Sequence, residues 1–212
     1  MAGKIITVAQ QKGGSGKTTL AANLAVALGR AGHRVALLDI DPQGSLGRWF
    51  MARVERAGPE GPGLDFSTAS AWGVGYECDK LCRDNDFVLV DTPPKVDADL
   101  RPALRAADLV LVPVASSHVD LWATEGVLDL ARREGRPTVV VLNRSRKGMR
   151  LADDVATATG ALDTILAESR LANRVVYAET LGTGQGVAEA GNPAAKAEIA
   201  ALTAEVLRHL PD

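Results

Sequence analysis

The chain has 212 residues, of which 46% are hydrophobic and 24% are charged, and these values exclude an intrinsically disordered or fibrous chain. Lys and Arg total 24 and Asp and Glu total 26, so the net charge is −2 and nucleic-acid binding would need a local basic patch. Two cysteines are too few for a disulfide framework, and no run of about 18 apolar residues is long enough to form a membrane-spanning helix.

Short β-branched runs alternate with stretches of helical periodicity, which predicts βαβ units around a mostly parallel sheet. Strands are expected, in chain order, at Lys4–Gln10, Arg34–Asp39, Leu64–Ser67, Phe87–Asp91, Leu109–Val114, Thr138–Asn143 and Thr164–Leu166. Helices are expected at Thr18–Arg30, Leu46–Arg56, Leu100–Ala106, Leu121–Arg133, Arg150–Thr159, Leu171–Thr180 and Pro193–Leu210. The predicted fold is therefore α/β, a single domain over 1–212 with three layers and a doubly wound sheet covered by helices on both faces. In such folds ligands bind at the carboxyl ends of the strands.

A glycine-rich loop joins the first expected strand to the first helix. It reads Lys12, Gly13, Gly14, Ser15, Gly16, Lys17, Thr18, Thr19. Glycines let consecutive N–H groups point at phosphate oxygens, and the helix N-terminus adds the positive end of its dipole. In a P-loop of this kind Lys17 reaches the terminal phosphates and the Thr18 hydroxyl ligates Mg²⁺, which indicates ATP and Mg²⁺ as ligands.

The loop departs from the ordinary P-loop at one position. Five residues before Gly16, where that pattern has glycine, this chain has Gln11, and Lys12 opens the loop. In this deviant Walker A form the chain resembles the ParA/MinD superfamily of dimerising ATPases. The resemblance extends from Lys4 to the final helix.

Three polar residues follow other expected strands. Asp41 comes just after the second strand, where a carboxylate can position an attacking water, and the resemblance assigns it that role. Asp91 ends a run of four apolar residues in the manner of a Walker B motif and would hold Mg²⁺ through water, with Pro93 and Pro94 stiffening the following segment. Asn143 ends a later strand where the family has an adenine-contacting asparagine, although asparagine is also a common strand terminator.

Two segments narrow the resemblance to short ParF-like ParA proteins. They are Ser117–Ala123 and Asn173–Glu179. Asp120 and Trp122 equally suit a helix N-terminal carboxylate and a core aromatic. No DNA-reading domain is expected before the first strand, so direct repression of a promoter is not expected.

The resemblance implies a cycle in which two ATP-bound protomers face each other across their nucleotides. Lys12 would reach the partner's phosphates and, with Lys17 and Asp41, take part in catalysis. The homodimer would bind double-stranded DNA without sequence preference, and a cargo adaptor protein resembling ParB would stimulate hydrolysis and release. The expected location is the cytoplasm, in association with the nucleoid and without a membrane anchor.

Basic residues for DNA binding are expected after the Thr138–Asn143 strand and around a later turn. They are Arg144, Arg146, Lys147, Arg150, Arg170 and Arg174. The segment Asn143–Arg174 contains these six basic residues and four acidic residues, so its net charge is +2. A dimer doubles this patch. A solvated face of a charge-balanced protein is the alternative interpretation.

Three other functions fit the P-loop less well. A membrane-associated MinD-like regulator needs a basic amphipathic anchor, whereas the charges of the last helix balance. An iron–sulfur reductase needs suitably placed cysteines, whereas Cys78 and Cys82 lie four apart in an expected helix. A biosynthetic ATP-dependent ligase stays open as a minor alternative.

Overall fold

The computed structural model describes residues 3–94, 100–115, 118–145 and 164–211, with the side chains of 118–123 excepted. Seven strands form one sheet in the order β3-β2-β4-β1-β5-β6-β7, and every pair of neighbouring strands is parallel. The strands are β1 (Lys4–Val8), β2 (Val35–Asp39), β3 (Asp65–Thr68), β4 (Phe87–Asp91), β5 (Leu109–Val114), β6 (Thr138–Leu142) and β7 (Ile165–Leu166). Since β1 lies in the middle, the loop that follows it is at the centre of the carboxyl edge.

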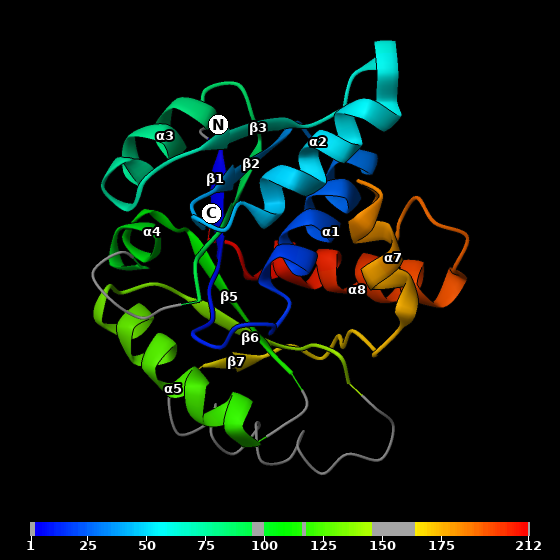
Figure 1. Cartoon of the computed structure of the whole chain (residues 1–212). Coiled ribbons are helices and arrows are strands. Elements are labelled where there is room, and N and C mark those ends of the chain that lie inside the picture. Colours follow the sequence, from blue (N-terminus) through cyan, green and yellow to red (C-terminus); the bar gives the residue numbers. More distant parts are fainter. Residues whose placement is uncertain (1–2, 95–99, 116–117, 146–163, 212) are drawn as a thin grey trace.

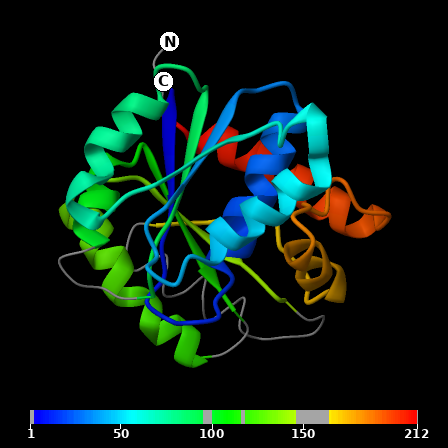
Figure 2. The same ribbon diagram turned by 45° about the horizontal axis from the view of Figure 1, so that its top comes forward.

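Helices cover both faces of this sheet (Figures 1 and 2). They are α1 (Lys17–Arg30), α2 (Ser45–Ala57), α3 (Val74–Leu81), α4 (Leu100–Ala106), α5 (His118–Arg133), α7 (Val175–Gly182) and α8 (Pro193–His209), with short 3₁₀ turns η1 (Gly58–Glu60) and η2 (Ala71–Gly73). One face carries α1, α2, α7 and α8, and the other carries α3, α4 and α5. The three-layer α/β fold is confirmed.

The alternation of side chains along each strand divides the core into two layers. Ile6 and Val8 of β1 pack in the layer under α1 and α8, whereas Ile5 packs in the opposite layer with α3. Both sets are buried, which explains why the strand sequences are apolar nearly throughout.

One expected helix begins later than the sequence indicates. The sequence predicts a helix over Leu171–Thr180, but α7 begins at Val175. Backbone hydrogen bonds instead hold residues 171–173 against the end of β6 and the residues that follow it. Leu171 N–H donates to Leu142 O, and Asn173 N–H donates to Ser145 O. This pairing joins residues far apart in the sequence, so local periodicity does not reveal it. The expected helix at 150–159 lies outside the described residues.

Candidate nucleotide site

The glycine-rich loop connects β1 to α1 at the centre of the carboxyl edge. Gly14 has φ +78° and Gly16 has φ +94°, a region that side chains with a Cβ rarely adopt. A Cβ on Gly16 would also collide with the side-chain amide of Asn143. Only glycine fits this position, and α1 begins at the next residue, Lys17.

Two glutamines anchor the start of the loop. The buried Gln10 side chain donates to Pro113 O at 3.2 Å and to Thr124 Oγ1 at 3.0 Å, and its Oε1 accepts the Gln11 N–H at 2.8 Å. Gln11 packs against α5 at Gly126, where a Cβ would lie 2.6 Å from Gln11 Nε2. The residue that departs from the ordinary P-loop therefore contacts a neighbouring helix, and Gln10 is a supporting residue that the sequence motif did not identify.

Asn143 lies against the same loop. It is 7% exposed, and its Nδ2 donates to Ser15 O at 2.9 Å while its Oδ1 accepts the Arg144 N–H at 2.9 Å. Each end of the amide retains one further hydrogen-bonding position, so the adenine contact stays a prediction.

Lys17, Thr18 and Asp91 form the polar centre of the site. Thr18 Oγ1 donates to Asp91 Oδ2 at 2.6 Å, and both Lys17 and Asp91 are buried. Burial raises the pKa of Asp91 to about 7 although the Thr18 hydrogen bond lowers it. Burial also lowers the pKa of Lys17, while the negative charges of Asp91 and Asp41 raise it. The two groups are therefore poorly solvated, and each stabilises the charged form of the other.

Two side-chain oxygens of this centre have no hydrogen-bond partner within the described part of the chain. They are Ser15 Oγ and Asp91 Oδ1, and both are buried. Buried polar atoms are nearly always partnered in native proteins, so such atoms point to a missing ligand. A carboxylate oxygen beside a threonine hydroxyl is the donor set that Mg²⁺ prefers, and a hydroxyl in a glycine-rich loop suits a phosphate oxygen. The residues present therefore fit both ATP and Mg²⁺.

Asp39 and Asp41 shape the loop after β2. Asp39 is 3% exposed and accepts the N–H groups of Asp41 at 3.0 Å and Gly47 at 2.9 Å. Burial raises the pKa of Asp39, although these two N–H groups lower it. Asp41 is half-buried, and its Oδ1 accepts the Gln43 N–H at 2.9 Å. Asp39 thus fixes the loop that presents Asp41, a role the motif did not assign to it.

The end of β4 is tied to the end of β1. Thr92, which is fully buried, donates from Oγ1 to Val8 O at 2.9 Å. This bond places Pro93 and Pro94 beside the Asp41 loop.

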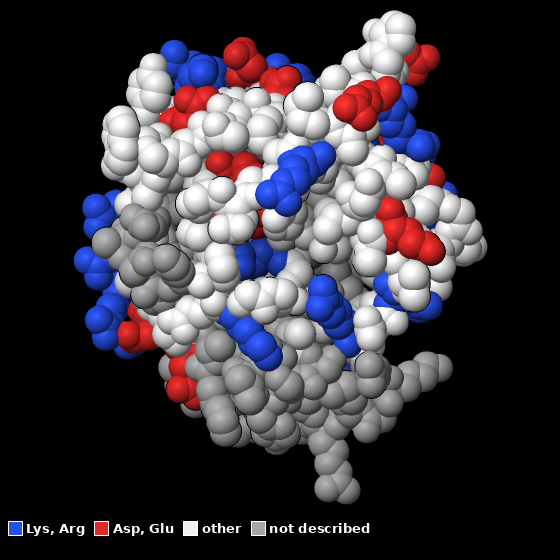
Figure 3. All heavy atoms as spheres, in the orientation of Figure 1, with Lys and Arg blue, Asp and Glu red and all other residues white. Residues whose placement is uncertain are grey.

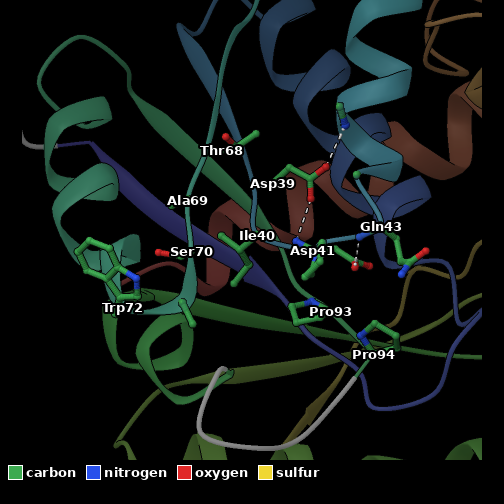
Figure 4. A pocket seen from close by; sticks show the side chains of 14 residues that line it. Asp39, Ile40, Asp41, Gln43, Thr68, Ala69, Ser70, Trp72, Pro93 and Pro94 are labelled. Atoms are coloured by element: carbon green, nitrogen blue, oxygen red, sulfur yellow. Dashed lines mark hydrogen bonds between the residues drawn. The ribbon is translucent and has the colours of Figure 1, made fainter.

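A pocket of about 800 Å³ opens beside Asp41 (Figure 4). Its walls come from the Asp39–Gly44 loop, the segment from Thr68 to Trp72, and Pro93 and Pro94. Figure 4 shows Trp72 at one end and Asp41 with the two prolines at the other.

The six basic residues expected to bind DNA are only partly placed. Arg144, with φ +53°, and Arg170 are exposed, whereas Arg146, Lys147 and Arg150 lie outside the described residues. Arg174 is bonded to Glu198 through two nitrogens at 2.9 and 2.7 Å, and these bonds raise its pKa. A bridge between Ser145 and Ala172 brings the two basic segments together at the carboxyl edge. Lys12, half-buried, opens the P-loop at the same edge.

Other features bear on the alternative functions. Cys78 is buried in α3 and Cys82 follows that helix, and burial raises the pKa of their thiols to about 12 and about 11, unlike reactive thiolates. In α8, Ile199, Leu202 and Val206 are buried in the core. Over the ranges that the structure describes, no helix combines the length and apolar character needed to cross a bilayer.

The chain is similar to known nucleotide-binding proteins. Residues 6–181 match the CobQ/CobB/MinD/ParA nucleotide binding domain. The maintenance of carboxysome distribution protein A of Halothiobacillus neapolitanus is 31% identical over 193 residues, which cover 88% of this chain and 87% of that protein. The chromosome-partitioning ATPase Soj of Thermus thermophilus is 36% identical over 149 residues, 59% of each chain.

Solved structures share the fold. The MinD cell division protein of Aquifex aeolicus superposes with a TM-score of 0.78 at 20% identity, covering 99% of both chains. The structure of pNOB8 ParA bound to nonspecific DNA gives a TM-score of 0.70 at 19% identity, covering 98% of both chains.

Proposed function

The chain belongs to the CobQ/CobB/MinD/ParA family of nucleotide-binding domains, whose ParA and MinD members are ATPases, and we propose that it is an ATP-dependent dimerising ATPase that positions DNA or a large protein cargo. One observation carries the proposal: Lys17, Thr18 and Asp91 converge behind a glycine-rich loop that holds two unpartnered buried oxygens. The names of the relatives support the cargo class, since one distributes carboxysomes and another partitions chromosomes.

The P-loop binds the phosphates. Backbone N–H groups between Gly13 and Thr19, together with the N-terminus of α1, would bind the phosphate oxygens, and the Lys17 ammonium would neutralise the terminal phosphates. The ammonium is held among carboxylates and shielded from water, so its interaction with phosphate is stronger than a surface lysine would give. Asn143 supports the loop at Ser15 and has an amide edge available for adenine.

Thr18 and Asp91 are the residues that would hold Mg²⁺. Bound there, the ion would neutralise charge on the phosphates and orient them. Thr18 Oγ1 presents a lone pair, and Asp91 presents its unpartnered Oδ1. The hydrogen bond between these residues keeps both oxygens in one place.

Asp41 orients the attacking water. One of its oxygens accepts the Gln43 N–H, which leaves the other to accept a hydrogen bond from water. Asp39 keeps this loop in position through two backbone hydrogen bonds. The Thr92 contact to β1 helps to hold Pro93 and Pro94 beside the Asp41 loop.

Dimerisation couples the site to cargo positioning. Lys12 would cross to the phosphates of a second copy, so the dimer would last only while ATP is bound. Replacing Lys12 with Ala should therefore weaken the ATP-dependent dimer more than it weakens nucleotide binding by the monomer. Sedimentation and nucleotide titration, done in parallel, measure both quantities.

The dimer would use the nucleoid as its track. The exposed Arg144 and Arg170 would contribute to the basic surface, together with Arg146, Lys147 and Arg150, which lie outside the described residues, and Arg174, which is paired with Glu198. The related pNOB8 ParA has been solved bound to nonspecific DNA, which supports this role. A cargo adaptor protein would stimulate hydrolysis and release the dimer. The last helix uses its apolar stripe in the core, which favours this mechanism over a MinD-like membrane anchor.

DNA binding tests the proposal. Fluorescence anisotropy with a double-stranded oligonucleotide should show binding with ATP and Mg²⁺, weak binding with ADP, and a steep fall with salt. Arg170→Ala should lower the salt slope by about one for each protomer of the dimer, while Lys196→Ala on the exposed side of α8 should leave the slope unchanged. Absence of ATP-dependent binding at low salt would contradict the DNA track.

A further inference from the structure

The start of the P-loop is attached to a different layer of the molecule from the end of the loop. Gln10 and Gln11 contact α5, which covers one face of the sheet. Lys17 begins α1, which covers the other face. Lys12 lies in the sequence between these two attachments, so its direction depends on how the start of the loop is held.

The Gln10 side chain is held on three sides. Its Nε2 donates to Pro113 O at 3.2 Å, near the end of β5, and to Thr124 Oγ1 at 3.0 Å, in α5. Its Oε1 accepts the N–H of Gln11 at 2.8 Å. Gln10 and Thr124 are each 1% exposed, so water does not compete for their hydrogen bond. The amide therefore has one orientation, and its oxygen fixes the backbone at the residue that precedes Lys12.

Gln11 makes a second contact with the same helix. A Cβ at Gly126 would lie 2.6 Å from Gln11 Nε2, so the absence of a side chain at Gly126 gives the Gln11 amide room to lie against α5. Thr124 and Gly126 belong to one turn of α5, and this turn supports two consecutive loop residues. Both of these loop residues precede the glycines, so they are not among the residues whose N–H groups would bind phosphate.

The direction of a lysine side chain matters at the carboxyl edge. Figure 3 shows this face hollowed, with carboxylates in the upper part of the hollow and Lys and Arg side chains below them. A lysine that turns towards carboxylates of its own chain forms an internal ion pair, whereas a lysine held away from them can meet an anion from outside the chain.

We propose that Gln10 is a positioning residue for Lys12, and that its bond to Thr124 makes α5 the support that sets the direction of the Lys12 ammonium. The inference rests on the proposed function, in which Lys12 crosses to the phosphates of a second copy. The Gln10 side chain is buried against β5 and α5, so it acts through the backbone at Gln11. Loss of its bonds weakens the contact made by Lys12 and leaves the phosphate contact of Lys17 in place.

Dimerisation and nucleotide binding by Gln10→Leu test this role. With AMP-PNP and Mg²⁺, sedimentation equilibrium should give a dimer dissociation constant at least about tenfold higher than that of the wild type, because the start of the loop loses its hydrogen bonds. The affinity of the monomer for a fluorescent ATP analogue, measured at low protein concentration, should change less than about threefold. A wild-type dimer dissociation constant in Gln10→Leu would overturn the proposal.

Two substitutions at Thr124 repeat the test with less disturbance of the core. Thr124→Val keeps the shape of the side chain but removes the hydroxyl that accepts from Gln10, so the dimer dissociation constant should rise about threefold. Thr124→Ser keeps the hydroxyl and should dimerise like the wild type. Equal dimerisation by the two variants would show that this bond does not reach Lys12, and the proposal would fail.

A double-mutant cycle separates positioning from general loosening. If Gln10 acts through Lys12, Gln10→Leu should raise the dimer dissociation constant of Lys12→Ala less than about twofold. Asn23→Leu is the structural control, because Asn23 is also 1% exposed, donates to Thr19 O at 2.8 Å and accepts the Val187 N–H at 2.7 Å on the α1 side. This variant should lose stability in urea unfolding but weaken the dimer less than about threefold.

The remaining outcomes distinguish the two levels of the account. A tenfold effect of Gln10→Leu that persists in Lys12→Ala, or an equally large effect of Asn23→Leu on the dimer, would assign the loss to general loosening and overturn the proposal. A wild type that binds AMP-PNP but stays monomeric, or a Lys12→Ala variant that dimerises normally, would instead contradict the proposed function.

Discussion

Asp91, at the carboxyl edge of the sheet, is fully buried with one oxygen unpartnered, whereas Glu205 of α8 is equally buried and accepts the N–H groups of Glu168 at 2.7 Å and Ser169 at 2.9 Å. The pKa values of the two carboxyl groups depend on how many hydrogen bonds each accepts. Burial raises the pKa of Asp91, while at Glu205 the hydrogen bonds outweigh burial and bring the pKa below its ordinary value. A buried carboxylate oxygen without a hydrogen-bond partner is costly, so the unpartnered Oδ1 of Asp91 marks where a ligand completes the structure.

Other charged side chains around α8 also have hydrogen-bond partners within the protein. Glu198 accepts hydrogen bonds from Ala172 N, Arg174 and the Tyr177 hydroxyl. Nearby, Arg53 is paired with Glu189 through two bonds at 2.9 and 3.0 Å and also donates to Pro62 O and Gly184 O. These networks fix loops onto the scaffold and need no ligand.

The largest expected effect is on ligand binding at the carboxyl edge. Lys17→Ala should weaken ATP binding about hundredfold, because it removes a charge-assisted contact to phosphate. The stability of the nucleotide-free protein should fall little, because the substitution removes the cost of burying the ammonium together with the support that the ammonium gives to Asp91. Calorimetric titration and thermal unfolding measure the two effects, with Lys196→Ala as the control. Unchanged ATP affinity would remove Lys17 from the site.

A substitution at the Arg53 network, away from the carboxyl edge, should lower the stability of the protein more than its affinity for ATP. Arg53→Ala should lower the free energy of unfolding by about 3 kcal/mol, since it leaves Glu189 and two carbonyl groups without their partner. ATP binding by the folded fraction should change less than threefold, roughly the effect of an uncoupled site. Arg34→Ala is the matched control, because its ion pair with Asp86 is exposed and therefore contributes little to stability. If urea unfolding showed equal losses of stability for Arg53→Ala and Arg34→Ala, the Arg53 network would not be a special part of the scaffold.

Asp91→Asn should raise the free energy of unfolding in the absence of ligand and lower it when ATP and Mg²⁺ are bound. The neutral amide can still accept the Thr18 hydrogen bond, so the nucleotide-free protein should gain about 1 kcal/mol from removal of a poorly solvated charge. The stabilisation that Mg²⁺ adds to ATP binding should be lost. Unfolding measured with no ligand, with ATP, and with ATP and Mg²⁺ separates the two effects. A less stable nucleotide-free variant would show that Asp91 serves the scaffold instead.

The smallest effect is the pH dependence of Glu205. Its folded-state pKa lies below the unfolded value, so its stabilising contribution is complete above the unfolded pKa and is lost as pH falls through the folded pKa. Glu205→Gln should cost about 1 kcal/mol at pH 7, because the neutral amide has a single acceptor oxygen for the two N–H groups. The cost should shrink as acid protonates the wild-type carboxylate. Urea unfolding at several pH values measures this. A loss that does not shrink in acid would contradict the assignment.

The sequence predicts contiguous motifs and strands well, and it predicts contacts between elements distant in the sequence poorly. The P-loop motif is contiguous, so Gly16, Lys17 and Thr18 could be placed before the fold was known, and the apolar runs predict the strands. The partners of Gln10, Asp39 and Arg53 could not be foreseen, because each contact depends on the packing of separate elements. Likewise, the start of α7 at Val175 depends on pairing with Ser145. The roles assigned to Asp41, Lys12 and the basic residues stay predictions.

The most direct test of the account is phosphate release from ATP by the wild type and by Asp41→Ala, with ATP binding measured in the same samples. The wild type should hydrolyse ATP in the presence of Mg²⁺. Asp41→Ala should bind ATP but hydrolyse it about a hundredfold more slowly, and its ATP-bound dimer should accumulate. Hydrolysis by Asp41→Ala at the wild-type rate, or a wild type that neither binds nor hydrolyses ATP, would contradict the account.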